Sequence, residues 1–161
     1  MNKYIAFLRG VNVGGNNLIK MSELRSYLEQ VGFSNVNTIL ASGNIIFDSP
    51  EVDVSLVRNQ VQTLIQEKFR LAIPVIIITA ERLTSLFTSF NAGERAISPE
   101  IVSYATFLGD ATVPGQDVIF STVSLSCAQH TTDLMLTLER EYGKNITTRN
   151  MKTLQKISAL I

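Results

Sequence analysis

The stretch from Arg9 to Asn17, RGVNVGGNN, is the first part of the chain whose residue types suggest chemistry. Gly10 and Gly15 have the spacing of the two glycines in a phosphate-binding P-loop, G-x-x-x-x-G. In a P-loop a lysine and a serine or threonine follow, to bind the terminal phosphates and magnesium, whereas this chain has Asn16 and Asn17. The spacing also differs from the G-x-G-x-x-G of dinucleotide-binding folds. Nucleotide hydrolysis at this loop is therefore not predicted.

Two interpretations of the loop stay open. Glycine and asparagine tolerate positive φ, so the loop could be only a tight path for the chain. Its length favours a function, because about ten residues separate the expected strand from the expected helix, where roughly two to six are usual. Long loops often carry binding residues. The second interpretation is therefore a site for a small ligand or an anion.

A second candidate site is TTRNMKT, from Thr147 to Thr153. Arg149 and Asn150 are expected in the first turn of the last helix, where backbone N–H groups lack intrahelical partners, with Lys152 nearby. With a helix before it, the stretch suggests either a helix-turn-helix that reads DNA or an ordinary helical hairpin with a basic solvated face. The hairpin is favoured, because a DNA-reading helix normally belongs to a basic domain. Nucleic acid is thus a weak candidate partner.

The sequence shows no other clear pattern of catalytic or metal-binding residues. Cys127 and His130 are the sole cysteine and histidine, which excludes an internal disulfide and a cysteine–histidine zinc cluster. We interpret Cys127 as a small buried residue and His130 as a loop or helix-cap residue. No carboxylate pair or Ser-His-Asp arrangement stands out. No cofactor or metal is expected, and whether the protein is an enzyme stays open.

Composition indicates a compact globular protein. The chain has 161 residues, 45% hydrophobic and 17% charged, with a formal net charge of zero. Its length suits one domain or two small halves, and its neutrality gives no global attraction to nucleic acid or anionic membranes. The first residues are too short an apolar run for a signal peptide, and no apolar stretch could span a bilayer. We expect a cytoplasmic protein with no membrane partner.

Hydrophobic periodicity predicts the elements of the first half. Ser22 would be the N-cap of the first helix and Gly32 would end it, while Gly43 and Asn44 would form a two-residue hairpin. The expected elements are strand 3–8, helix 22–32, strands 36–40 and 45–47, helix 54–69 and strand 75–78. This order is βαββαβ, the ferredoxin-like or α/β-plait arrangement. We therefore predict an α+β fold with a ferredoxin-like subdomain over residues 1–80.

A second, reduced α/β subdomain is expected over residues 81–161. YATFLGD at 104–110 loosely resembles YIAFLRG at 4–10, which hints at a second half of related design. The expected elements are helix 83–90, strand 102–108, one or two strands within 118–127, and a closing helix pair. Thr147 would cap the last helix, with a hydrophobic staple between Ile146 and Met151. We also expect this half to cover the second apolar face or the edge of the first sheet.

Topology then brings the polar loop residues together. In a sheet of strand order 4-1-3-2, the first two strands run toward the same end. The Gly/Asn loop, the start of the first helix, the ASGN turn at 41–44 and the connection at 71–74 should meet there. A positive helix end at this edge favours an anion. The predicted ligand-binding residues are Arg9, Asn12, Gly14, Gly15, Asn17, Lys20, Ser42, Gly43 and Asn44.

These motifs resemble the bacterial domain-of-unknown-function 1697 family. The resemblance lies in FLRGVNVGGNN, MSELRSYLEQVGF, ILASGNIIF and the closing TTRNMKTLQKI, so it covers the first half and the last dozen or so residues. It implies a pair of α/β-plait-like subdomains and no established function. The chain departs from the family pattern in three ways. Asn16 stands where lysine is common, Met151 stands where tryptophan is usual, and the second half is shortened.

The leading functional hypothesis is a non-catalytic binding module. Its ligand would be a small anion, a nucleotide or a nucleic-acid phosphate at the Gly/Asn loop. One alternative is a small enzyme that uses the same pocket, with Arg9 or Lys20 stabilising charge. Another is a structural module that forms a homodimer through an exposed strand edge.

Overall fold

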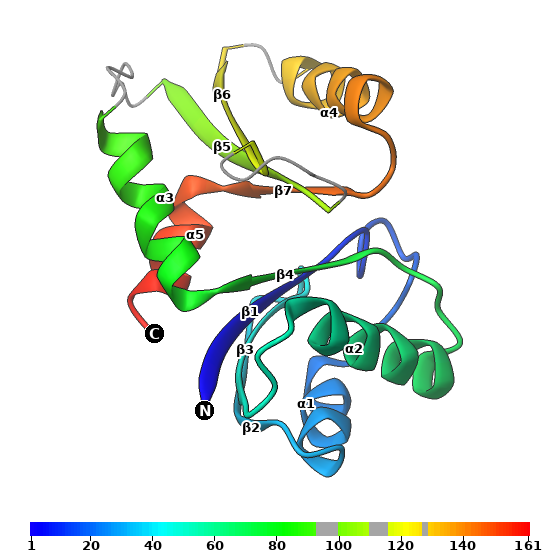
Figure 1. Cartoon of the computed structure of the whole chain (residues 1–161). Helices are drawn as coiled ribbons and strands as arrows, with labels where there is room; N and C mark the ends of the chain where they lie inside the picture. Colours follow the sequence, from blue (N-terminus) through cyan, green and yellow to red (C-terminus); the bar gives the residue numbers. More distant parts are fainter. Residues whose placement is uncertain (93–99, 110–115, 127–128) are drawn as a thin grey trace. The chain divides into compact units, whose positions relative to one another are not determined.

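The computed structural model describes residues 1–92, 100–109, 116–126 and 129–161, which form a mixed α+β fold with two antiparallel sheets and five helices. The chain divides into two compact units, unit 1 with Met1–Arg82 and Ile161, and unit 2 with Leu83–Leu160 (Figure 1). In chain order the elements are β1 (Asn2–Leu8), α1 (Met21–Gln30), β2 (Ser34–Ile39), β3 (Asn44–Ser49), α2 (Val54–Phe69), β4 (Val75–Thr79), α3 (Ala80–Ala92), β5 (Ile101–Leu108), β6 (Val118–Ser124), α4 (Gln129–Tyr142), β7 (Ile146–Asn150) and α5 (Met151–Ser158). No helix among the described residues is long and apolar enough to cross a membrane.

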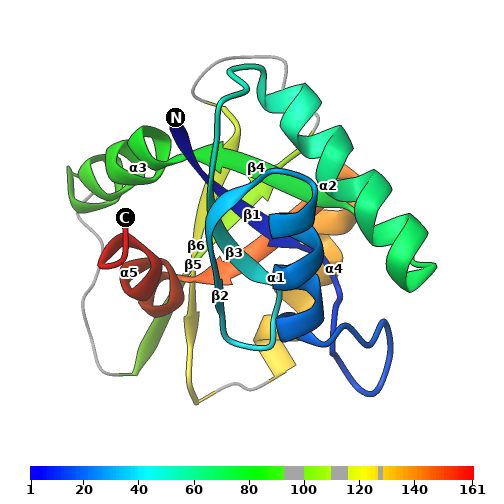
Figure 2. The ribbon, with the colours of Figure 1, turned by 90° about the horizontal axis from the view of Figure 1, so that it is seen from below.

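Unit 1 is a four-stranded sheet with two helices on one face. The strand order is β2-β3-β1-β4, and each neighbouring pair is antiparallel. The helices α1 and α2 lie across the same face of this sheet, as the view from below shows (Figure 2). The carboxyl ends of β1 and β2 and the start of α1 therefore share one edge of the sheet.

The core of unit 1 forms between this sheet face and the two helices. Alternate residues of β1, including Tyr4, Ala6 and Leu8, belong to one buried apolar cluster with the inner faces of α1 and α2. Leu28 of α1 and Val61 of α2 are fully buried in it. Each such aliphatic side chain contributes about 1.5–3 kcal/mol on burial, so this core is the main source of stability in unit 1.

The N-cap of α1 corrects the sequence prediction. Lys20 is the N-cap, with extended backbone and no side-chain cap, and Ser22 lies inside the helix. By contrast, Asp53 caps α2 with its side chain, which accepts the N–H of Ser55 at 2.7 Å. The first turn of α1 therefore begins without the side-chain acceptor that Ser22 was expected to supply.

The turn between β2 and β3 is also longer than predicted. Asn44 is the first residue of β3 and pairs with Ile39, so residues 40–43 form the connection. A two-residue hairpin centred on Gly43 and Asn44 is therefore wrong. Leu40 and Gly43 have positive φ, 61° and 75°. Leucine rarely adopts such a backbone, so the turn holds Leu40 in an unfavourable conformation.

β2 contains an irregularity near its start. The register with β3 shifts between Ser34 and Asn37, and Asn35 has a left-handed φ of 52°. The Asn35 side chain donates to Asp48 Oδ2 at 2.7 Å, and Lys3 Nζ lies 2.9 Å from Asp48 Oδ1. Burial raises the pKa of Asp48, but these hydrogen bonds and the charge of Lys3 outweigh it and hold the pKa below its ordinary value.

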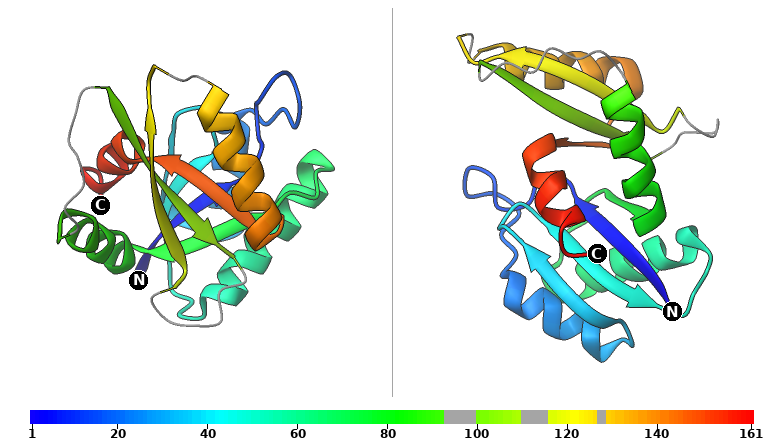
Figure 3. Two further views of the ribbon diagram at one scale, coloured as in Figure 1. Left: turned by 90° about the horizontal axis from the view of Figure 1, so that it is seen from above. Right: turned by 90° about the vertical axis from the view of Figure 1, so that its left-hand side faces the viewer.

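Unit 2 contains the three-stranded antiparallel sheet β6-β5-β7. Helix α4, orange in Figure 3, lies across one face of this sheet and contacts β6 and β7. Helix α5 contacts β5 and β7. Thr106 of β5 and Thr148 of β7 form a hydroxyl hydrogen bond of 2.9 Å, which fixes the register of the two strands. β5, which contains most of YATFLGD, is the middle strand.

The end of the chain differs from the predicted helical hairpin. Residues Ile146–Asn150 form β7, so a strand separates α4 from α5. Thr147 lies within that strand and caps no helix. The N-cap of α5 is Asn150, whose side chain accepts the N–H of Lys152 at 2.8 Å. Both the helix-turn-helix and the helical hairpin are therefore wrong, as is the proposed staple.

Candidate functional site

The Gly/Asn loop folds into a small β-hairpin. Asn12 N–H donates to Asn17 O at 3.2 Å and Asn16 N–H to Val13 O at 3.0 Å. Gly14 and Gly15 form its tip with φ of 57° and 80°, the sign required at both central residues of a type I′ turn. The hairpin is exposed and extends away from the sheet of unit 1, in blue in Figure 3. The two glycines are therefore needed for the turn.

The asparagines at the base of this hairpin hold the loop together. The Asn12 side chain donates to Ile19 O at 3.0 Å and Ala41 O at 2.8 Å, and accepts Ile19 N–H at 2.9 Å. Asn17 Nδ2 donates to Gly10 O at 3.0 Å. Asn12 and Asn17 both have positive φ, which asparagine tolerates better than most residues. Their side chains serve the loop backbone in this structure.

Three segments meet at this end of unit 1, and we call residues 9–20, 40–43 and 71–74 the loop edge. Leu8 N–H donates to Gly43 O at 2.8 Å, and Arg9 N–H donates to Pro74 O at 3.1 Å. Asn12 joins the loop to Ala41, as described above. The structure thus brings together the segments that the topology placed at one edge.

Not every predicted residue of this edge is available to a ligand. Asn44 is fully buried and donates to Ile39 O at 2.9 Å and Ser42 Oγ at 3.0 Å. Gly43 is buried against Leu8 and Val11. Both residues therefore position the edge, whereas Ser42 lies exposed beside them.

The charged residues of the loop edge are basic, Lys20 at the start of α1 and Arg9 after β1. Lys20 precedes the first helical turn, and its Nζ lies 3.2 Å from Glu23 Oε1. Arg9, partly buried, follows the end of β1. A helix N-terminus carries a partial positive charge. Glu23 N–H donates to Lys20 O at 3.0 Å, so the backbone donors that a helix start offers here are those of Met21 and Ser22, beside the positive charge of Lys20.

The residues of the second predicted site lie on β7 and at the start of α5. Arg149 lies on β7 and donates to Thr147 Oγ1 at 2.8 Å and Thr148 O at 3.0 Å. Burial lowers the pKa of Arg149 to about 10. Asn150 caps α5, and Lys152 is exposed. The three side chains thus have separate structural settings, and a shared binding role for them stays a prediction.

Two further sequence predictions concern the other reactive residues. Cys127 and the side chain of His130 lie outside the described part of the structure. Within the described part, no group of three histidine, cysteine, aspartate or glutamate side chains is placed to hold a metal ion.

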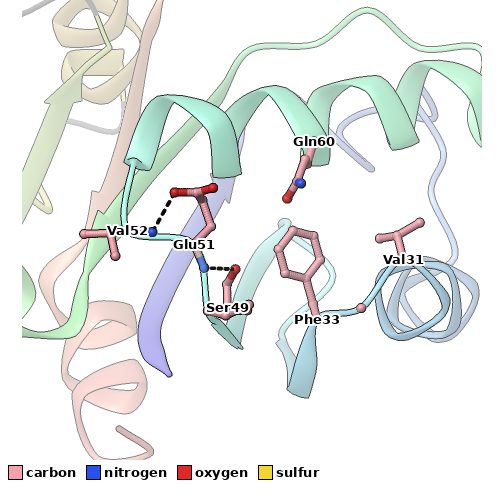
Figure 4. A pocket seen from close by; sticks show the side chains of 8 residues that line it. Val31, Phe33, Ser49, Glu51, Val52 and Gln60 are labelled. Carbon is pink, nitrogen blue, oxygen red and sulfur yellow. Dashed lines mark hydrogen bonds between the residues drawn. The ribbon is translucent and has the colours of Figure 1, made fainter.

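A pocket at the other end of unit 1 was missed by the sequence analysis. Its volume is about 440 Å³, and it forms where α1 ends and α2 begins (Figure 4). Three separate segments build it, so no local motif marks it. The residues that line it are Val31, Gly32, Phe33, Ser49, Pro50, Glu51, Val52 and Gln60. Gly32 and Pro50 are turn residues, but such residues indicate a turn and not a pocket.

Comparison with known proteins identifies a family and a fold. The model of a family described as protein of unknown function (DUF1697) matches residues 1–122. The solved structure of the conserved bacterial protein SP0830 from Streptococcus pneumoniae resembles this chain with a TM-score of 0.79. It covers 99% of this chain and 98% of its own chain at 23% identity, which shows similarity of fold alone. No curated protein matches.

Proposed function

The chain belongs to the DUF1697 family of proteins of unknown function, and we propose that it is a non-catalytic binding protein that holds a phosphate group at the loop edge. The observation that carries this proposal is the start of α1, which has Lys20 as its N-cap and no side-chain acceptor. A bound phosphate would accept from the N–H groups of Met21 and Ser22, which precede the first bonded N–H of the helix, and pair with Lys20.

The topology of unit 1 supports this placement. We infer that unit 1 has the ferredoxin-like arrangement, since its elements run β1-α1-β2-β3-α2-β4 and its strand order is β2-β3-β1-β4. This arrangement places the end of β1, the start of α1 and the β2–β3 turn together. We also infer a cytoplasmic location, because the chain has a single cysteine and no disulfide is available.

Glu23 provides a specific test of the phosphate site. Its carboxylate pairs with Lys20 at 3.2 Å and lies in the first turn of α1, where it competes with an anionic ligand. Glu23→Gln should therefore tighten phosphate binding, whereas Arg9→Ala and Lys20→Ala should weaken it. Arg25→Ala is the matched control, because Arg25 lies one turn further along α1 and pairs with Glu29.

The experiment is a thermal-shift titration with inorganic phosphate, nucleotides and short oligonucleotides. A ligand at about 100 times its Kd stabilises the folded chain by about 2.7 kcal/mol. We expect Tm to rise with the logarithm of ligand concentration above the Kd, a rise that Glu23→Gln increases and Lys20→Ala removes. A rise unaffected by Lys20→Ala and Arg9→Ala would refute this site. The comparison among free phosphate, nucleotide and oligonucleotide identifies the molecule that carries the phosphate.

A further inference from the structure

The pocket beside Phe33 has the size of a small-ligand site. Its volume of about 440 Å³ lies within the roughly 300–1,000 Å³ typical of pockets for small organic molecules. All its lining residues belong to unit 1, at the end of the sheet opposite the loop edge. Its shape therefore depends on a single compact unit.

One wall of the pocket is apolar and firmly held. The Phe33 ring is 5% exposed and packs against Phe47 with 4.6 Å between ring centroids. Val31 and Val52 stand at the rim and are 56% and 75% exposed. Exposed valines beside an ordered aromatic ring offer an apolar surface that a ligand could cover.

The Glu51 carboxylate is held in place through one of its two oxygens. Glu51 Oε1 accepts the N–H groups of Val52 at 2.8 Å and Asp53 at 2.9 Å, which turns the carboxylate toward the start of α2 (Figure 4). Among the described residues, Oε2 has no hydrogen-bond partner and the carboxylate has no ion pair. The pocket therefore carries an ordered negative charge with one oxygen open to a donor.

Two more polar groups line the same pocket. Gln60 extends from α2 toward the Phe33 ring, and its amide makes no hydrogen bond within the described structure (Figure 4). Ser49 is 2% exposed, and its Oγ accepts the N–H of Glu51 at 3.2 Å. The Gln60 amide oxygen and Glu51 Oε2 are thus two acceptors available to a ligand.

The Tyr4 phenol beside the pocket responds to the acidic residues at this end of unit 1. Tyr4 Oη donates to Glu51 O at 2.7 Å beside the pocket. Burial raises the pKa of this phenol, and the negative charge of Glu51 raises it further. A hydrogen bond with Asn2 lowers the pKa by less, and the charges of Glu81 and Asp53 add smaller increases. The phenol therefore stays neutral at neutral pH, and Glu51 is the one charged residue among those that line the pocket.

We propose that this pocket binds a small organic cation, an ammonium group on an apolar body, with Glu51 as its counter-charge. The ammonium donates to Glu51 Oε2 and the Gln60 amide oxygen, and the apolar body packs against Phe33 and the rim valines. This site is independent of the phosphate site at the loop edge, and Arg9→Ala should leave it unchanged.

The test is a titration of the ¹⁵N-labelled full chain, with phenethylammonium as the probe. Phenylethanol and phenylpropionate are its neutral and anionic analogues. We expect phenethylammonium to shift the backbone amide signals of Gly32, Phe33 and Val52 saturably, and both analogues to bind more weakly. Absence of binding, equal binding of phenylpropionate, or shifts confined to other residues would overturn the proposal.

Charge variants identify the counter-ion. Glu51→Gln keeps an oxygen for the N–H groups of Val52 and Asp53 and removes the charge, so the Kd should rise about tenfold or more. Glu67→Gln removes the same charge from an exposed position of α2 and should leave the Kd unchanged. A Kd unaffected by Glu51→Gln would overturn the proposal.

Gln60 gives a second pair of variants that does not alter the capped start of α2. It is exposed, and both replacements suit a helix. Gln60→Lys should abolish phenethylammonium binding by repulsion, and Gln60→Glu should strengthen it. The reverse order, or no difference between the two, would contradict an ammonium site.

Discussion

Gly43 offers the most direct test of how the loop edge is packed. Its φ is 75°, and a Cβ added there would lie 2.6 Å from Val11 Cγ2 and 2.7 Å from Leu8 Cβ. The left-handed backbone costs an alanine about 1–2 kcal/mol, and overpacking typically costs about 1–3 kcal/mol. We therefore expect Gly43→Ala to lower the free energy of unfolding by about 2–5 kcal/mol, a large part of the roughly 5–15 kcal/mol of a typical domain.

Gly15→Ala separates the cost of the left-handed backbone from the cost of close packing. Gly15 has a nearly equal φ of 80°, but no atom lies within 4 Å of an added Cβ. This variant should cost only the backbone penalty of about 1–2 kcal/mol. Urea denaturation followed by circular dichroism gives both free energies under the same conditions. If Gly43→Ala is no more destabilising than Gly15→Ala, the close packing of Gly43 against Leu8 and Val11 is refuted.

Three further predictions concern stability. Asn12→Ala removes three hydrogen bonds at the hairpin base and should lower the free energy of unfolding by about 1–3 kcal/mol. Amide hydrogen exchange in residues 9–20 should become faster, and unchanged exchange would show that Asn12 does not anchor the loop. Asn150→Ala removes the cap of α5 and should lower the free energy of unfolding, measured by urea denaturation, by about 0.5–2 kcal/mol. Ser22→Ala removes no cap and should change the same free energy by less than about 0.5 kcal/mol. Equal losses in the two variants would indicate that Ser22 caps α1 after all. Because its pKa is held below the ordinary 3.8, Asp48 stabilises the fold fully above that pH, and this contribution is lost as the pH falls through the folded-state pKa. The wild type should have a higher free energy of unfolding than Asp48→Asn, and urea titrations should show this difference shrinking as the pH falls below 3.8. A difference that does not change with pH would contradict the lowered pKa of Asp48.

Local patterns predicted the parts of unit 1 that local physics determines. The α2 helix has its predicted bounds, 54–69, because one apolar stripe spans it and a left-handed Arg70 ends it. The meeting of the loop with the β2–β3 turn was also predictable, since it follows from the order of the elements. The role of Asn12 was not, because its partner Ala41 lies on a separate turn.

Long-range contacts decided the features that the sequence analysis missed. Residues Ile146–Asn150 have helix-cap residue types, yet they pair with β5 about forty residues earlier and become β7. β-branched residues favour strands, and here tertiary pairing prevailed over the capping pattern. The pocket beside Phe33 likewise depends on three segments that meet only after the chain has folded, so no spacing in the sequence marks it.

The irregular start of β2 affects how the protein behaves at high concentration. β2 is an outer strand of the unit 1 sheet, and an outer strand can pair with strands of other molecules. The left-handed Asn35 interrupts its regular backbone, which leaves only Asn37–Ile39 in continuous register with β3. A bulged and locally twisted outer strand is a poor template for a further strand. Growth of the sheet by addition of other chains at this strand is thereby disfavoured.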